Sequence, residues 1–158
     1  AVVKAGLTAL GEAERAPLAL GTTLDDADLR EMEAEMVTAH CGHAHPMIGG
    51  MVDAQRFKDA SMAHALRAAP KRAILIAGRG HTRKDRGVGR FLDAKGVVSV
   101  AFIGVEEAWT EAKDYLGRAP GADILWFTDR VEREDPCVAF RAHLEQMKAR
   151  KRAGESER

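Results

Sequence analysis

Apolar positions in the first half of the chain recur at helical spacing. A helix is predicted from Thr23, a favourable N-cap residue with acidic residues in the following turn, to about His40. A longer helix is predicted over 48–68. Its repeating positions, at spacings of three or four, are Met51, Gln55, Asp59, Met62 and Leu66. Residues 1–11 are predicted to be the tail of an earlier helix and 12–22 a loop.

Short apolar runs mark the second half of the chain. Strands are predicted at 73–77, 97–103 and 124–127, with helices over 87–94 and 106–116 between them and a last helix from Asp135. Strands that alternate with helices form parallel sheets. We therefore expect an α/β fold with a parallel or mostly parallel sheet of at least three strands flanked by helices. Residues 1–150 would form a single α/β domain and 151–158 a charged flexible tail.

Composition excludes few functions. The 158 residues suit one domain. The 24 basic and 24 acidic side chains give a formal net charge of zero, so that no excess of positive charge attracts nucleic acid, and we expect no nucleic-acid partner. Cys41 and Cys137 lie far apart, so that a disulfide is possible but not implied. No apolar run has transmembrane length and no signal peptide is visible. Because the chain opens inside a helix without methionine, we expect residues upstream of it.

The strand predicted at 73–77 ends in a glycine-rich loop that carries a histidine. Gly78 and Gly80 precede His81, and ligands of open α/β sheets bind at the carboxyl ends of strands. His81 is therefore a candidate ligand-binding residue, or the acid or base of an enzyme. The alternative is a loop histidine bonded to a neighbouring carbonyl.

Basic residues around His81 indicate an anion. Arg79, Arg83, Lys84 and Arg86 follow the first glycine, and arginine pairs with carboxylates and phosphates in a bidentate manner. A dinucleotide fingerprint would need its third glycine where Arg83 stands, and no Walker lysine follows. A Rossmann nucleotide site is not expected.

Gln55 and Asp59 lie four residues apart within the apolar face of the helix over 48–68. Buried polar groups need partners. One interpretation, which we favour, is that they tie the helix to the loop through Arg83 or Arg86. The other is that they contact the His81 side chain and hold it in position.

A second cluster combines ligand types that soft metals prefer. It comprises His40, Cys41, His43 and His45, and ligand type alone does not define a site. His40 can instead complement the end of its helix, and Cys41 can pack as a small hydrophobic residue. Tyr115, the only tyrosine, is predicted to lie at a surface edge.

Several of these motifs, taken in order, resemble the ChaN-like haem-binding uptake family of the Tiki/TraB/erythromycin-esterase-like superfamily. The residues that carry the resemblance are Ala39–Gly42, Met51–Arg56 with Asp59 and Met62–Ala63, Ile76–His81 with Arg83, Asp85 and Arg86–Val88, Trp126–Thr128, and Glu134–Cys137 with Phe140–Arg141. The resemblance covers nearly the whole chain. It implies the C-terminal part of the family's domain, without the opening Gly-Glu-x-His strand.

The resemblance implies haem binding, a role in iron or haem uptake, and a bacterial cell-envelope location through an N-terminal lipid anchor that we expect upstream of these residues. In the family, haem ligation is attributed to tyrosine within a homodimer, and Tyr115 does not map onto that ligand. His81 would line the cleft, and Arg83 and Arg86 would meet the haem propionates.

Two alternatives remain open at this point. In a metal-dependent hydrolase of the superfamily, a divalent metal would be the cofactor, with His81 as ligand or acid/base group and Gln55 and Asp59 in support. The other alternative is a catalytically silent scaffold that pairs with a partner.

Overall fold

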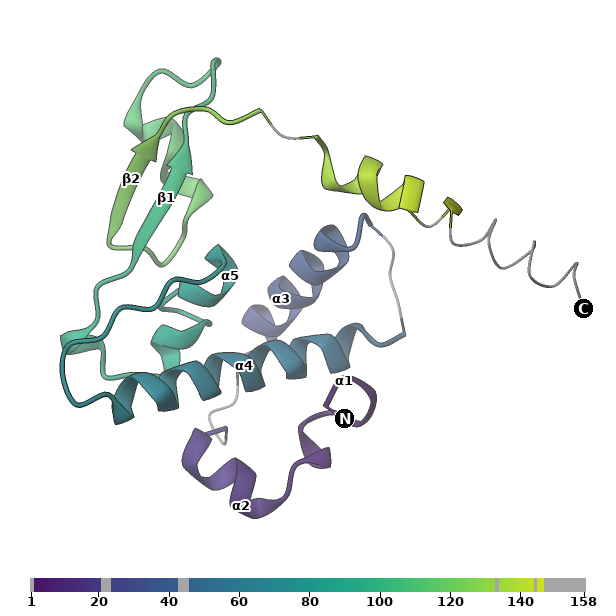
Figure 1. The fold of residues 1–158 in the computed structure, drawn as a ribbon, viewed down its shortest axis with the longest axis vertical. Helices are drawn as coiled ribbons and strands as arrows, with labels where there is room; N and C mark the ends of the chain where they lie inside the picture. The colour runs from purple at the N-terminus through teal and green to yellow at the C-terminus, as the bar shows by residue number, and fades with distance from the viewer. Residues whose placement is uncertain (1, 21–23, 43–45, 133, 144, 147–158) are drawn as a thin grey trace, which may run out of the picture.

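The computed structural model describes residues 2–20, 24–42, 46–132, 134–143 and 145–146. A long central helix, α4, spans Ile48–Ala68, and several of the other helical elements pack against it below a small sheet (Figure 1). The confirmed fold class is a mixed helix and sheet arrangement. The remaining helical elements are short apart from α3: α1 (Val2–Ala5), η1 (Leu7–Ala9), α2 (Glu12–Arg15), η2 (Ala16–Leu18), α3 (Asp26–Ala39), α5 (Arg79–Thr82), η3 (Val88–Phe91), η4 (Ala94–Gly96) and η5 (Ala112–Arg118).

Helix α3 begins and ends with local capping interactions. Asp25 is its N-cap, and its carboxylate accepts a 2.8 Å hydrogen bond from the backbone N–H of Asp28. Thr23, predicted to be the cap, lies outside the described residues. At the other end Cys41 adopts a left-handed φ of 61°, and the N–H of Gly42 donates to the Val37 carbonyl at 2.9 Å. The predicted end near His40 is confirmed.

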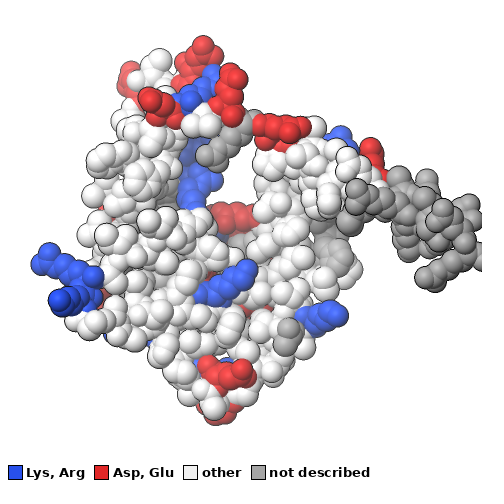
Figure 2. Space-filling view, viewed as in Figure 1, with Lys and Arg blue, Asp and Glu red and all other residues white. Residues whose placement is uncertain are grey.

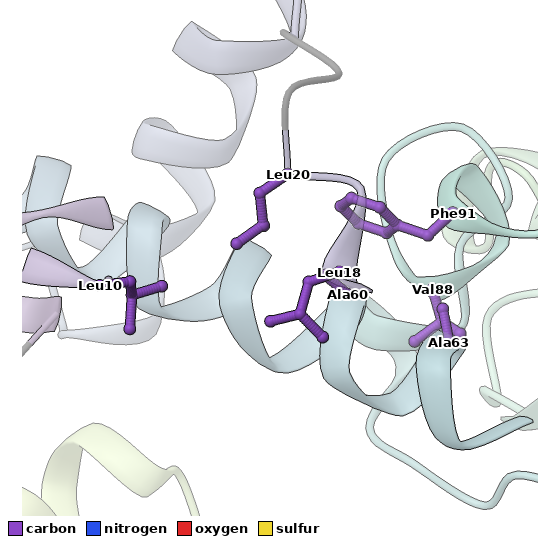
Figure 3. Close-up of a cluster of buried hydrophobic side chains, with 7 residues drawn as sticks. All are labelled: Leu10, Leu18, Leu20, Ala60, Ala63, Val88 and Phe91. Carbon is purple, nitrogen blue, oxygen red and sulfur yellow. The ribbon is translucent and has the colours of Figure 1, made fainter. Parts of the chain in front are cut away.

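Helix α4 is the scaffold of the larger core. Its bounds agree with the predicted 48–68, and it buries Val52, Asp59, Ala60 and Ala63. Figure 3 shows the core cluster that packs against the two alanines, whose small side chains allow neighbouring segments to approach. The cluster consists of Leu10, Leu18, Leu20, Ala60, Ala63, Val88 and Phe91. The loop predicted over 12–22 therefore contributes helical turns to the core.

The sheet contains two parallel strands, β1 (Val100–Gly104) and β2 (Ile124–Thr128), in register from Val100 opposite Ile124 to Gly104 opposite Thr128. One face packs on a second, smaller cluster of Ala101, Ile103, Tyr115 and Ala119. The parallel pairing is confirmed, whereas a sheet of three or more strands is not found among the described residues.

The prediction of a strand at 73–77 is wrong. The segment has no strand pairing, and the side chains of Ile74 and Ile76 are 90% and 93% exposed. A strand requires a neighbour for its backbone hydrogen bonds, and β1 pairs only with β2 among the described residues. The predicted helices over 87–94 and 106–116 form the shorter 3₁₀ turns η3 and η5.

A helical segment over 136–143 follows β2, as predicted from Asp135. A disulfide joins Cys137 to Cys41 with a Cα–Cα distance of 5.5 Å, and so connects this segment to the end of α3. The interpretation of Cys41 as a small packed hydrophobic residue is therefore wrong. No helix among the described residues is long and apolar enough to span a membrane. The tail over 151–158 lies outside the described residues.

Candidate functional site

His81 lies in α5, directly after the extended segment 73–77. Its backbone N–H donates to the Gly78 carbonyl at 2.8 Å. Behind it, the N–H of Gly87 donates to the Arg83 carbonyl at 3.1 Å, and a Cβ on Gly87 would lie 2.3 Å from the His81 carbonyl oxygen. Gly87 therefore permits the chain to turn back closely on α5 and fixes the backbone that carries the histidine.

Helix α5 lies beside the amino end of β1. The Ser99 hydroxyl, one residue before β1, donates to the Thr82 carbonyl at 2.7 Å. The carboxyl ends of β1 and β2 are at the opposite end of the sheet (Figure 1). The expectation that His81 would sit at a carboxyl sheet edge is wrong, because its own segment does not join the sheet.

Two side chains of α4 contact the imidazole of His81. Nδ1 lies 2.6 Å from Asp59 Oδ1 and 2.9 Å from Gln55 Nε2, and the ring Nε2 is 3.5 Å from that amide nitrogen. Asp59 and Gln55 are one helical turn apart and face the same direction. Of the two interpretations of this pair, the structure supports contact with His81. Pairing of Gln55 or Asp59 with Arg83 or Arg86 is not observed.

Burial is the main influence on the pKa of Asp59. Its side chain is 1% exposed, and its Oδ2 atom is buried without a hydrogen-bond partner among the described residues. Burial raises the pKa of Asp59 from 3.8 to about 6, against the opposing effect of the hydrogen bond and charge of His81. Asp59 is therefore ionised at neutral pH but carries a free-energy penalty for being so.

The geometry assigns different roles to the two ring nitrogens. A neutral imidazole has one N–H and one lone pair, and an ionised carboxylate can only accept. With Asp59 ionised, Nδ1 carries the hydrogen that Asp59 accepts, and Nε2 carries the lone pair. The amide nitrogen of Gln55 is also a donor, so its hydrogen can be accepted only by Nε2, at 3.5 Å. The ring is 23% exposed, so the site presents a partly accessible imidazole whose orientation is held by a buried carboxylate.

Gly78 and Gly80 leave the neighbourhood of the ring open. A Cβ on Gly78 would lie 3.9 Å from His81 Cδ2, and one on Gly80 would lie 3.9 Å from Gln55 Nε2. Both are ordinary contacts, and Gly78 has a φ of −60° that any residue adopts. The fold does not require glycine at either position, and a ligand that approaches His81 closely would.

Arg83 and Arg86, expected to bind haem propionates, are occupied by carboxylates of the chain. Arg83 is 8% exposed and contacts Asp85 and, at 3.3 Å, Glu35. Arg86 is 2% exposed and contacts Glu35 and, at 3.0 Å, Glu31. These contacts tie α3 to the loop after α5. Sequence reasoning missed the two glutamates, although their spacing of four on α3 places them on one helix face.

Tyr115 is buried rather than at a surface edge. It is 3% exposed between Trp109 and Phe127, and its hydroxyl donates to the Trp109 carbonyl at 2.9 Å and accepts from the Glu106 N–H at 2.8 Å. The prediction failed because residues 112–118 form a 3₁₀ turn, which shifts the face that each residue presents. The hydroxyl of Tyr115 is therefore already bonded to backbone groups as both donor and acceptor.

The predicted metal cluster is not assembled among the described residues. Cys41 is in the disulfide, and Nδ1 of His40 lies 2.7 Å from the Met36 carbonyl oxygen, as the structural alternative for His40 anticipated. His43 and His45 lie outside the described residues. No group of three or more histidine, cysteine, aspartate or glutamate side chains in the described part of the chain is placed to hold a metal ion.

A hollow of about 610 Å³ lies beyond the carboxyl ends of the strands. Glu106, Glu132 and Glu134 line it together with Arg130 and Val131. On the face shown in Figure 2, acidic side chains gather at the end of the molecule that carries the strands, and charges elsewhere are scattered. Three glutamates against one arginine make the hollow unfavourable for carboxylate ligands.

The fold and site thus define a mixed α/β protein with a carboxylate-supported histidine after a glycine-rich turn. The family model for haem-binding uptake proteins of the Tiki superfamily, ChaN, matches residues 1–92. The match includes α3, α4 and α5, and with them Gln55, Asp59 and His81. The chain belongs to this family. No curated protein and no solved structure matches the chain.

Proposed function

We propose that the protein binds haem at the α4–α5 site and serves haem or iron uptake. The observation that carries the proposal is the His81 imidazole, held by Asp59 at 2.6 Å and flanked by two glycines that the fold does not need. Membership of the haem-binding uptake family supports it. The site also lies wholly within the matched residues.

The residues present fit haem chemically. The porphyrin supplies the in-plane nitrogens, so that the protein needs to contribute only an axial group, and a single imidazole can do so. Haem also carries propionates. Arg83 and Arg86 are held by carboxylates, whereas Arg79 is exposed two residues before His81 and would be a guanidinium for a propionate.

The same geometry supports a second candidate function, a hydrolase. A histidine whose Nδ1 faces a buried carboxylate is the arrangement of a general base, with Nε2 as the proton acceptor. Asp59 would hold the ring and His81 would move the proton. Hydrolysis that depends on added divalent metal and disappears in His81→Ala would favour this function over haem binding.

We propose a cell-envelope location, with a homodimer and a lipid anchor as further expectations from the family. The Cys41–Cys137 disulfide supports the location, because disulfides persist in the oxidising periplasm and are rare in the cytosol. Cell fractionation of the tagged full-length protein tests it. Recovery in the cytosol with both thiols reduced would count against it.

Titration of ferric haem into the purified chain tests the main proposal. We expect saturable binding and a shift of the Soret band, and an affinity that falls roughly tenfold in Arg79→Ala, about the value of one exposed charged hydrogen bond. Arg141→Ala, which removes an exposed arginine of the 136–143 helix outside the matched residues, is the control. A Soret band identical to that of free haem would refute the proposal.

A further inference from the structure

Helix α3 contributes little to the apolar core and is tied to the loop after α5 by charged side chains. Its 14 residues bury one side chain, that of Met32, and neither core cluster of the described residues includes a residue of α3. Three of its acidic residues lie on one face and contact arginines that follow α5. The pairs are Arg83–Glu31 at 3.6 Å, Arg83–Glu35 at 3.3 Å, Arg86–Glu31 at 3.0 Å, Arg86–Glu35, and Arg90–Asp28 at 3.6 Å.

Arg83 and Arg86 are held in place by their own segment as well as by α3. Asp85 accepts hydrogen bonds from Nε of Arg83 at 2.9 Å, from its Nη2, and from the backbone N–H of Arg86 at 3.0 Å. The side chains of Arg83 and Arg86 are 8% and 2% exposed, whereas those of Glu31 and Glu35 are 55% and 52% exposed. The two glutamates therefore lie on the solvent side of a guanidinium pair that Asp85 positions independently of them.

The contacts of the pair favour a compact oxyanion. Oε1 of Glu35 is 3.3 Å from Nη1 of Arg83 and also accepts from Nη2 of Arg86, so that one oxygen serves both guanidiniums. Nη1 of Arg86 is buried and has no hydrogen-bond partner among the described residues, although Oε2 of Glu31 is 3.0 Å away. A buried donor without an acceptor is unfavourable. The glutamates thus supply charge without completing the hydrogen bonds of Arg86.

We propose that Arg83 and Arg86 form a binding site for a phosphate group, and that Glu31 and Glu35 occupy it as a built-in competitor. A phosphate group carries about two negative charges and three acceptor oxygens, and it pairs with arginine in a bidentate manner. It would replace the charge of both glutamates in one compact group and offer an acceptor to Nη1 of Arg86. This site goes beyond the proposed haem function and does not use His81.

Phosphate binding requires α3 to move away from the arginines, and the attachments of α3 allow this. Few apolar contacts would be lost, because Met32 is its one buried residue in the described structure. The disulfide at the end of α3 leads from Cys41 to Cys137. Of the described residues over 134–146, all except Cys137 are exposed, so the disulfide does not anchor α3 to either core cluster.

Titration with inorganic phosphate, followed by calorimetry against chloride of equal ionic strength, tests the proposal. We expect weak binding to the wild type and roughly tenfold tighter binding to Glu31→Gln/Glu35→Gln, because apparent affinity falls with the fraction of molecules whose site is covered. Phosphate should also raise the thermal midpoint of this variant more than that of the wild type. In the wild type, saturating phosphate should speed hydrogen exchange of the α3 amides and leave α4 unchanged.

Two further variants locate the effect. Asp26→Asn/Glu33→Gln removes the same charge from α3 at positions that make no described contact with Arg83 or Arg86, and it should bind phosphate like the wild type. Arg86→Lys, added to the glutamine variant, keeps the positive charge but loses the bidentate group, and should abolish most of the gain.

Three results would overturn the proposal. They are no phosphate binding by the wild type or the glutamine variant, equal affinity in both, and an equal gain in the charge-matched control. If circular dichroism shows that the double glutamine variant misfolds, Glu31→Gln alone retains Glu35 and should give a smaller gain than the double change predicts; no gain in that folded variant would overturn the proposal as well.

Discussion

Replacement of Asp59 by asparagine tests the electrostatics of the site without any ligand. Burial raises the pKa of Asp59 from 3.8 to about 6, so the folded state holds a proton that the unfolded state releases between these values. Stability from this group is fully present below about pH 4 and is lost as the pH rises through about 6. At about 1.4 kcal/mol per pH unit, the loss approaches about 3 kcal/mol by pH 7. Asparagine has no such penalty.

Urea denaturation of both proteins, followed by circular dichroism from pH 4 to 7.5, measures the difference. We expect nearly equal free energies of unfolding at pH 4 and a more stable Asp59→Asn at pH 7, with most of the change between pH 4 and 6. Asp85→Asn is the control of opposite sign, because the hydrogen bond from Arg83 lowers the pKa of Asp85 and its contribution is lost as the pH falls. A difference between Asp59→Asn and wild type that is constant with pH would refute the reasoning.

Four further substitutions separate the fold from the site. Gly80→Ala should leave the thermal midpoint unchanged and weaken haem binding several-fold, whereas Gly87→Ala, with a Cβ 2.3 Å from a carbonyl oxygen, should lower the midpoint; equal midpoints would contradict this. Arg86→Ala should reduce the free energy of unfolding by about 1–3 kcal/mol while haem affinity per folded molecule stays constant. Cys137→Ser should cost about 2–4 kcal/mol in urea denaturation by releasing the link to Cys41, and an effect equal to that of dithiothreitol on the wild type would identify the bond as the cause.

The helices were predictable because their signals are local. The apolar repeat over 48–68 and the turn at His40 lie within the elements that they define, and both predictions are confirmed. The prediction of a strand at 73–77 failed because an apolar run indicates only that a segment can join a sheet, while the pairing itself depends on a neighbouring strand from elsewhere in the chain. The prediction of a surface position for Tyr115 failed because a change from α to 3₁₀ geometry moves a side chain to another face of the helix.

The site was predictable in its parts rather than in its connections. His81 could be selected from the glycines before it, and Asp59 and Gln55 from their polarity on an apolar face. Which of the nearby cations they would meet depended on how the loop folds over α4, across 22 residues of sequence between Asp59 and His81. Pairing of the neighbouring arginines with α3 left the histidine as the partner.

The unpaired segment 73–77 has a practical consequence for work with this chain. It consists of alanine, isoleucine and leucine, carries no charge or proline, has no strand partner, and exposes Ile74 and Ile76. Such a stretch is a template for intermolecular strand addition and aggregation. Preparations should therefore precipitate at high concentration, and a charged substitution such as Ile76→Lys, on a side chain that contributes almost nothing to the core, should increase solubility without lowering the thermal midpoint.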